Sequence, residues 1–441
     1  MTLIAGIYRL AINPPYPMTL FGYPHVPRLS TGIHDPLYAT ALFLSDEKPG
    51  VFLISLDLLM LPHEFLNACR DEISQRHNIP RKNILISCTH THSAPVTMDL
   101  LAFSGDHTVP PVDKCYLDLV GDAILSAASE AFHRAVPALA AITIAQVNGV
   151  GGNRHELDGP RDPQVNLLVV KEASSSRLMA LSLVYSMHPT VLHEDSTLVS
   201  ADFPGLTRIE LEKAYPQLTV IYQTGPSGNQ SPRYHVHNQT FTEAERLGNR
   251  LANFVIDAVK ELSEQDFRDH LELGALNSFI PLPTRIFPDV TDAEANLKQA
   301  IGTFEHLKRT GAPHGPTRTA EVAVFGAQEG VVLAKAQESG ELARLQQRYQ
   351  VTEVQVIRLG QAVVVGLAGE LFVEYGLELK RRIRDCCNAP AAVISLANGE
   401  LQGYIVTPQA QGYESSFSLF TPDAGSLLVE TGLQLAIELL K

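Results

Sequence analysis

Continuous apolar runs and stretches of helical periodicity alternate along most of the chain. The runs Val51–Met60 and Ile84–Cys88 are typical of strands whose two faces are both covered. Between them, Pro62–His77 places apolar side chains at the spacing of an amphipathic helix. This strand–helix–strand order favours parallel pairing of the two strands.

The same patterns predict the remaining elements. Further strands are expected at 3–12, 37–44, 139–147, 165–171, 178–187, 218–223, 353–359, 361–367 and 391–396. Further helices are expected at 113–135, 241–262, 292–310, 371–387 and 424–440, with others ending near residue 215 and lying around 330–347. The sequence therefore predicts an α/β fold, with one large domain over 1–441 around a mixed, mostly parallel sheet that has helices on both faces.

Two regions stand apart from this pattern. Residues 264–350 are the most polar and helical part of the chain, and they are predicted to form a helical insertion or subdomain beside the sheet. Residues 96–113 contain glycine, proline and histidine and are predicted to form a loop over the site described below.

Composition narrows the class of protein. The chain has 441 residues, 45% of them hydrophobic, and a formal net charge of −14, which argues against nucleic acid and anionic membrane surfaces as partners. No apolar stretch approaches the length of a transmembrane helix. The five cysteines lack CxxC spacing and the N-terminus lacks a secretory pattern, so a cytoplasmic protein is expected. A homo-oligomer is possible, since the amphipathic helix predicted at 424–440 can pack on its own chain or on a partner.

The first candidate chemistry lies where the run from Ile84 ends, at Thr89-His-Thr-His-Ser93. Side chains at i and i+2 of a strand point to the same face, so His90 and His92 are expected to project together. Two neutral imidazoles on one face begin a metal site. The alternative is a pair of histidines at the end of a strand that hydrogen-bond only to the backbone.

Other polar side chains also follow directly after apolar strands. Strand ends at one edge of a sheet bring such residues together although they lie far apart in the sequence. The residues in this position are His90, His92, His188, Ser231, Glu370 and Tyr404.

At this point the chain resembles a known family, the neutral (non-lysosomal) ceramidases, over their catalytic domain. The resembling pieces occur in the family's order and are Gly32–His34, Ser55–Asp57, Thr89–Ser93, Asn153–Arg154, His188–Thr190, Ser200–Asp202, Gly228–Pro232, Gly369–Glu370 and Asn398–Thr407. The resemblance implies a zinc-dependent amidase of the sphingolipid ceramide.

The resemblance also implies a set of zinc ligands, namely His90, His188, Glu370 and Tyr404. Two imidazoles and a carboxylate are a usual protein ligand set for a catalytic zinc ion that keeps a position open for water. A phenol oxygen is a weaker ligand, so Tyr404 can shift between the metal and a developing oxyanion.

Further roles follow from the same resemblance. His92 and Arg154 are expected at the reaction centre, and Ser231 either attacks the amide or only positions the substrate. The leading hypothesis is attack by zinc-activated water, with the oxyanion stabilised by zinc, Tyr404 and His92. His34 and Asp57 are expected to support the ligands, with Asp57 orienting a metal histidine.

The chain departs from the family pattern in the serine loop. Asn229 stands where the family usually has aspartate, and Arg233 stands where it has asparagine. Ala94–Val96 replace the glycines that usually follow the histidine motif, and no C-terminal immunoglobulin-like domain is expected. Arg233 and the polar region 264–350 favour a smaller or anionic acyl-amide substrate, unless the pocket is a purely apolar tunnel.

Two alternatives to amide hydrolysis stay open. One is a zinc hydrolase of a different linkage (an ester, lactone or cyclic amide) in a small soluble substrate. The other is a non-catalytic homologue that keeps the fold as a binding protein, for which absence of zinc and an occluded pocket would be expected.

Overall fold

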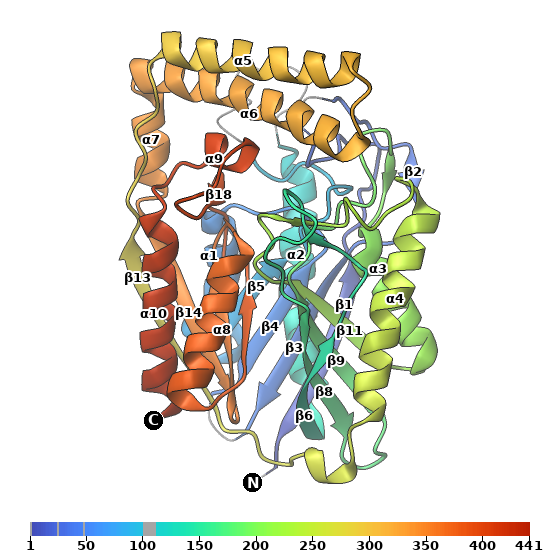
Figure 1. Cartoon of the computed structure of the whole chain (residues 1–441). Coiled ribbons are helices and arrows are strands. Elements are labelled where there is room, and N and C mark those ends of the chain that lie inside the picture. The colour runs from blue at the N-terminus through green and yellow to red at the C-terminus, as the bar shows by residue number, and fades with distance from the viewer. Residues whose placement is uncertain (1, 24–25, 47–48, 100–111) are drawn as a thin grey trace.

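The computed structural model describes residues 2–23, 26–46, 49–99 and 112–441. Two β-sheets pack face to face, and helices cover the outer face of each sheet (Figure 1). The α/β class and the mixed character of the large sheet agree with the prediction from the sequence.

The larger sheet has eight strands. In spatial order they are β11 (Thr219–Thr224), β9 (Leu178–Tyr185), β8 (Gln164–Glu172), β6 (Val136–Gln146), β1 (Ile4–Ala11), β3 (Tyr38–Ser45), β4 (Val51–Leu56) and β5 (Ile84–Cys88). Among these strands only β11–β9 and β4–β5 pair in parallel, and the other five pairs are antiparallel. The expectation of a mostly parallel sheet is therefore wrong. Most neighbouring strands here are joined without the helical crossover that parallel pairing needs.

The smaller sheet contains β13 (Leu273–Pro281), β14 (Val351–Leu359), β15 (Ala362–Leu367) and β17 (Ala391–Ile394). One of its faces lies on the larger sheet, and Leu85 of β5 belongs to the same apolar cluster as Val364 and Ile394. Each sheet thus has helices on one face only, which corrects the prediction of helices on both faces. A strand covered by a second sheet is apolar on both faces, just as a strand between two helical layers is.

The helices form the two outer layers. On the larger sheet these are α1 (His63–His77), α2 (Lys114–His133), α3 (Asp202–Ala214) and α4 (Phe241–Lys260). On the smaller sheet they are α8 (Val373–Cys387) and α10 (Asp423–Leu440). Short 3₁₀ turns occur at Arg81–Asn83 and Glu264–Asp266. Among the described helices, none is long and apolar enough to cross a membrane.

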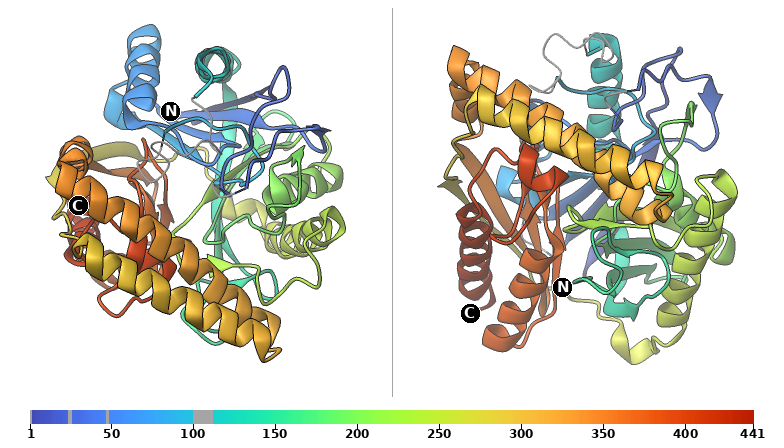
Figure 2. Two further views of the ribbon diagram at one scale, coloured as in Figure 1. Left: turned by 90° about the horizontal axis from the view of Figure 1, so that it is seen from above. Right: turned by 45° about the horizontal axis from the view of Figure 1, so that its top comes forward.

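The helical region predicted over residues 264–350 begins later than expected. Its first part contains β13, which pairs with β14 in the smaller sheet, and the helices follow as α5 (Val290–Arg309), α6 (His314–Ser339) and α7 (Glu341–Arg348). Helices α5 and α6 lie side by side across one end of the sandwich (Figure 2). Most of the loop predicted at 96–113 lies outside the described residues. The division of the chain into domains stays a prediction.

Three pairs of two-residue strands lie outside the two sheets. They are β2 (Gly32–Ile33) with β10 (Leu198–Val199), β7 (Gly152–Asn153) with β12 (Gln230–Ser231), and β16 (Glu370–Leu371) with β18 (Tyr404–Ile405). The short helix α9 (Tyr413–Phe417) follows the last of them. Two of these pairs hold residues of the candidate site.

Candidate metal centre and active site

The loops that follow β5, β9 and β11 meet at one end of the sandwich, and each carries polar side chains predicted from the sequence. His90 follows β5, His188 follows β9, and Ser231 lies beyond β11. The short strands β16 and β18 add Glu370 and Tyr404, which lie opposite each other in register. The structure therefore brings together residues from both sheets.

His90, His188 and Glu370 point at one another. The two Nε2 atoms lie 3.0 Å apart, and Glu370 Oε2 lies 3.1 Å from His90 Nε2 and 3.5 Å from His188 Nε2. Ligand atoms of a tetrahedral zinc ion, bound at about 2.0–2.2 Å, lie roughly 3.4 Å apart. The spacing of these three atoms thus suits one shared metal ion.

Backbone carbonyls fix the protonation of the two imidazoles. His90 Nδ1 lies 3.0 Å from the Leu59 carbonyl oxygen, and His188 Nδ1 lies 2.9 Å from that of Ser227. Because each Nδ1–H donates to a carbonyl, each Nε2 is left with a lone pair. Burial, and next the neighbouring His90, hold the pKa of His188 well below its usual value, which keeps this imidazole neutral.

Three acceptor atoms therefore face one another without a proton to share. Glu370 Oε2 is buried and has no hydrogen-bond donor among the described residues. Lone pairs at this separation repel unless a cation lies between them. Backbone bonding at Nδ1, the alternative noted from the sequence, does occur, but it leaves the Nε2 atoms free for a metal. The residues present fit a divalent ion with nitrogen and oxygen ligands.

His92 completes a group of three histidines whose ligand atoms lie within 4.8 Å of one another. Its Nδ1 lies 3.0 Å from the carbonyl oxygen of Gly22, whereas its Nε2 is buried without a partner among the described residues. The Nε2 atom is thus a proton acceptor. Burial, and next His90, hold the pKa of His92 well below its usual value.

The two histidines of the Thr89–Ser93 motif converge through a turn. Strand β5 ends at Cys88, and His90 has a φ of +67°, in the left-handed region. The expectation that both side chains project from one face of a strand is therefore wrong in its geometry. The left-handed residue still turns both imidazoles toward the same centre.

Gly22 makes the position of His92 possible, and we expect its replacement by alanine to be destabilising. Gly22 has a φ of +97°, and a Cβ atom there would lie 2.4 Å from His92 Nδ1. Gly340 has a φ of +79° with open space around it, so Gly340→Ala carries the backbone cost alone. We expect about 1–2 kcal/mol of lost unfolding free energy for Gly340→Ala, and a larger loss for Gly22→Ala, measured by urea unfolding. Equal losses would contradict the predicted collision with His92.

Glu370 is held by a strand and not by a helix. The sequence places it at the start of a helix, but α8 begins at Val373, and Glu370 pairs with Tyr404 through β16 and β18. Burial, and next the charge of Glu370, hold the pKa of Tyr404 well above its usual value, so its phenol is protonated and can donate a hydrogen bond. Whether Tyr404 also holds the metal stays a prediction.

Arg154 and Ser231 lie beside this centre. Ser231 belongs to β12, and Arg154 directly follows its partner strand β7. Arg154 Nε lies 2.5 Å from Glu414 Oε1, whereas its Nη2 is buried without a partner among the described residues. Although burial raises the pKa of Glu414, Arg154 lowers it to about 2, so the pair is ionised. Ser231 Oγ accepts the backbone N–H of Arg233 at 2.9 Å. No described histidine hydrogen-bonds to the Ser231 hydroxyl, so no partner for a serine nucleophile is in place.

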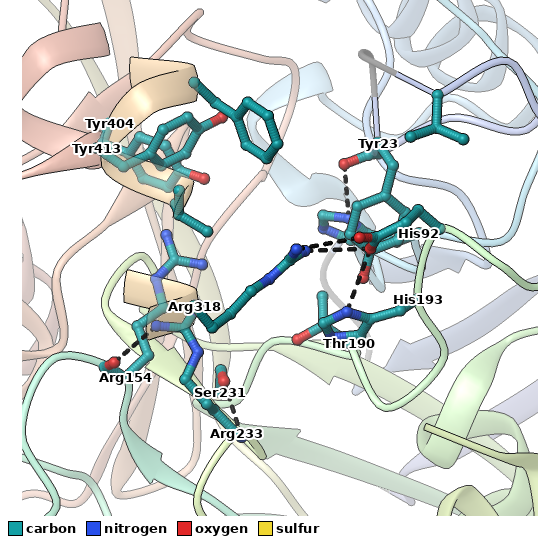
Figure 3. Close-up of a pocket in the computed structure, with 15 residues that line it drawn as sticks. Tyr23, His92, Arg154, Thr190, His193, Ser231, Arg233, Arg318, Tyr404 and Tyr413 are labelled. Carbon is teal, nitrogen blue, oxygen red and sulfur yellow. Dashed lines mark hydrogen bonds and ion pairs between the residues drawn. The ribbon is translucent and has the colours of Figure 1, made fainter. Parts of the chain in front are cut away.

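A pocket opens beside His92, Arg154, Ser231 and Tyr404 (Figure 3). Its remaining lining residues are Gly22, Tyr23, Val26, Thr190, His193, Glu194, Arg233, Arg318, Val322, Phe325 and Tyr413. The pocket is lined by both polar and apolar groups, so the result that would have excluded an anionic substrate, a purely apolar tunnel, is not found. One face of α6 roofs the pocket with residues at helical spacing, and Arg318 reaches across it to Glu194, 3.0 Å away (Figure 3).

Comparison with known proteins bears on this arrangement. A family model described as "Neutral/alkaline non-lysosomal ceramidase, N-terminal" matches residues 12–226. The neutral ceramidase of Pseudomonas aeruginosa is 22% identical over 458 aligned residues, which cover 91% of this chain and 67% of the relative. The chain is similar to the neutral ceramidases over these residues. The family resemblance predicted from the sequence is thereby confirmed.

The solved ceramidase structures share the fold. A structure described as a ceramidase complexed with C2 matches with a TM-score of 0.77 and 16% identity, and it covers all of this chain and 75% of that one. The crystal structure of the Pseudomonas aeruginosa neutral ceramidase matches with a TM-score of 0.76. The Drosophila melanogaster neutral ceramidase is 23% identical over 234 residues, and this chain covers only 33% of its length.

The two supporting residues expected from the ceramidase resemblance lie elsewhere. Asp57 is buried and pairs with Arg208 Nη2 at 2.8 Å, while the Leu59 carbonyl orients His90 instead. His34 is exposed and contacts Asp35 at 2.9 Å. The assignment of both residues to the support of metal ligands is therefore wrong, because backbone carbonyls take that role.

Other residues of the site were missed altogether. Gly22 supplies a carbonyl to His92, and Leu59 and Ser227 supply carbonyls to the two proposed ligands. Backbone groups leave no side-chain signal in a sequence. Arg318 of α6 could have been found only by placing the helical region over the site.

Proposed function

We propose that the protein is a zinc-dependent hydrolase of N-acyl amide bonds. The observation that supports this most is the set of three acceptor atoms from His90, His188 and Glu370, which lie 3.0–3.5 Å apart with both Nδ1 positions occupied. The identity of the metal and the activity are proposals, since the chain covers about a third of the length of the fly relatives.

When bound, zinc supplies an acidified water molecule and polarises the carbonyl group of the substrate. The protonated phenol of Tyr404 and the free Nη2 of Arg154 can donate hydrogen bonds to the carbonyl oxygen as its charge grows. The sequence suggested this role for His92 as well. Its Nε2 carries a lone pair, so in this proposal His92 accepts a proton and passes it to the leaving amine.

Ser231 positions the substrate in this proposal. Its Oγ is held by the Arg233 N–H, and the described residues offer no base to its hydroxyl. The non-catalytic alternative is less well supported, because an open pocket adjoins the proposed ligands.

The test measures hydrolysis products by mass spectrometry: the amine released from long-chain ceramide and short N-acyl amides, the alcohol released from esters, and the hydroxy acid formed from lactones. We expect amide cleavage by zinc-loaded protein, and a loss of at least about 100-fold after chelation that zinc restores. Zinc content per chain, measured by mass spectrometry of the metal, should fall and recover in parallel. Amide cleavage that survives complete zinc removal would contradict metal dependence. Cleavage of esters or lactones alone would contradict the proposed linkage.

A further inference from the structure

A second cavity adjoins the pocket, and the two differ in character. Arg233 and Arg318 line both cavities, together with Thr190 and His193. The second cavity is completed by Val236, His237, Asn238 and Gln239, so no carboxylate is among its lining residues. The pocket beside His92 has the apolar groups Val26, Val322 and Phe325. A substrate spanning both would place an apolar part in one and a polar part in the other.

Arg233 is the cation at the junction that lacks an acidic partner. Arg318 is ion-paired with Glu194 and Glu321, and Arg154 with Glu414. No carboxylate of the described residues lies within 4.0 Å of the Arg233 guanidinium. Its Nη1 donates a hydrogen bond to the Arg154 carbonyl oxygen at 2.9 Å. Burial, and next the charge of Arg154, lower the pKa of Arg233 to about 10, and the group is still charged at neutral pH.

The position of Arg233 ties this charge to the reaction centre. Its backbone N–H holds Ser231 Oγ, and its side chain lies beside Arg154 in the same part of the pocket (Figure 3). A largely buried guanidinium with free donors is a strong site for a carboxylate, which can accept two of its N–H groups in a fork. A substrate whose amine part carries no carboxylate would leave those N–H groups of Arg233 unpaired.

We propose that Arg233 binds a carboxylate on the amine part of the substrate, so that the preferred substrates are N-acyl amino acids. The acyl chain lies in the apolar part of the pocket beside His92, and the carboxylate lies at the junction with the second cavity. This inference rests on the proposed amide hydrolysis and adds the class of amide.

The test measures binding separately from turnover. The probes are ketone analogues in which a methylene replaces the amide nitrogen, so that they cannot be hydrolysed. One corresponds to N-octanoylglycine and a second to N-octanoylethanolamine, which has a hydroxymethyl group in place of the carboxylate. A third carries its carboxylate at the far end of the acyl chain. Affinities are measured by titration calorimetry on the zinc-loaded full chain.

We expect the glycine analogue to bind at least about tenfold more tightly than the ethanolamine analogue. Arg233→Gln should abolish this preference while changing the affinity for the ethanolamine analogue by less than about twofold. Arg233→Lys should keep part of the preference, because it keeps the charge and loses the fork. Arg381→Gln, on the exposed side of α8 beside Asp385, is the matched control and should bind as the unmodified chain does.

Three results would overturn the proposal. These are equal affinity of the unmodified chain for the first two analogues, an equal loss of both in Arg233→Gln, or tightest binding of the third analogue. Thermal unfolding of each variant shows whether it is folded. Because binding needs no turnover, a carboxylate preference without any amide cleavage would contradict the proposed function and leave the anion site standing.

Discussion

Replacing His188 with alanine is expected to remove the metal from the protein. His188 Nε2 lies 3.0 Å from His90 Nε2 and 3.5 Å from Glu370 Oε2, so the substitution deletes one of three proposed ligands. Losing even a residue that only orients a ligand weakens metal binding about 10–100-fold, and losing a ligand should cost more. We expect about one zinc ion per unmodified chain and less than about a tenth of that in His188→Ala after dialysis. Amide cleavage should fall with it.

His270→Ala is the matched control. His270 is exposed, and its Nδ1 lies 4.0 Å from Asp46 Oδ2. Because Asp46 is not a residue of the site, removing the His270 imidazole should leave the zinc content unchanged. Full zinc content in His188→Ala would contradict the assignment of this histidine as a ligand. A circular dichroism spectrum equal to that of the unmodified chain is needed for the comparison, because His188 is also completely buried.

Asp57→Ala is expected to produce the largest loss of stability among these variants. Asp57 and Arg208 are both buried and form an ion pair at 2.8 Å, and Asp57 also accepts the N–H of Tyr38 at 2.9 Å. Removing one partner leaves a buried charge without compensation, which costs about 3–5 kcal/mol. Urea unfolding measures this loss. The zinc content of the folded variant should be unchanged, since Asp57 does not orient His90.

Asp71→Ala provides the comparison for an exposed pair. Asp71 lies 3.3 Å from Arg81 on the surface, where such a pair contributes less than about 1 kcal/mol. Similar losses of unfolding free energy in the two variants would show that burial does not determine how much the Asp57–Arg208 pair contributes to stability. A loss of zinc from folded Asp57→Ala would restore the role that the sequence had suggested for it.

The positions of helices and strands could be predicted well, whereas the layering could not. The apolar run at Val51–Met60 does contain β4, and the spacing after Pro62 does form α1. Such a run shows that a strand is covered on both faces, but it does not say whether helices or a second sheet cover it. The covering sheet here comes from residues beyond 270, and local patterns carry no signal of that contact.

The residue types of the site could be predicted better than their geometry. His90, His188 and Glu370 come together as the family resemblance implied. Their orienting partners could not be foreseen, since the carbonyls of Leu59 and Ser227 belong to the backbone. A buried carboxylate such as Asp57 needs a partner, but the sequence cannot say which of several cations supplies it.

The proposed metal centre joins two parts of the chain that are made far apart in time. His90 and His188 follow strands of the larger sheet, whereas Glu370 follows β15 of the smaller one. A chain that emerges from the ribosome holds both histidines for some 180 residues of further synthesis before the carboxylate exists. Contacts at such separation form late because the intervening chain must first be ordered. Metal binding would then stabilise the packing of one sheet on the other, as a final step in the folding of the newly made protein.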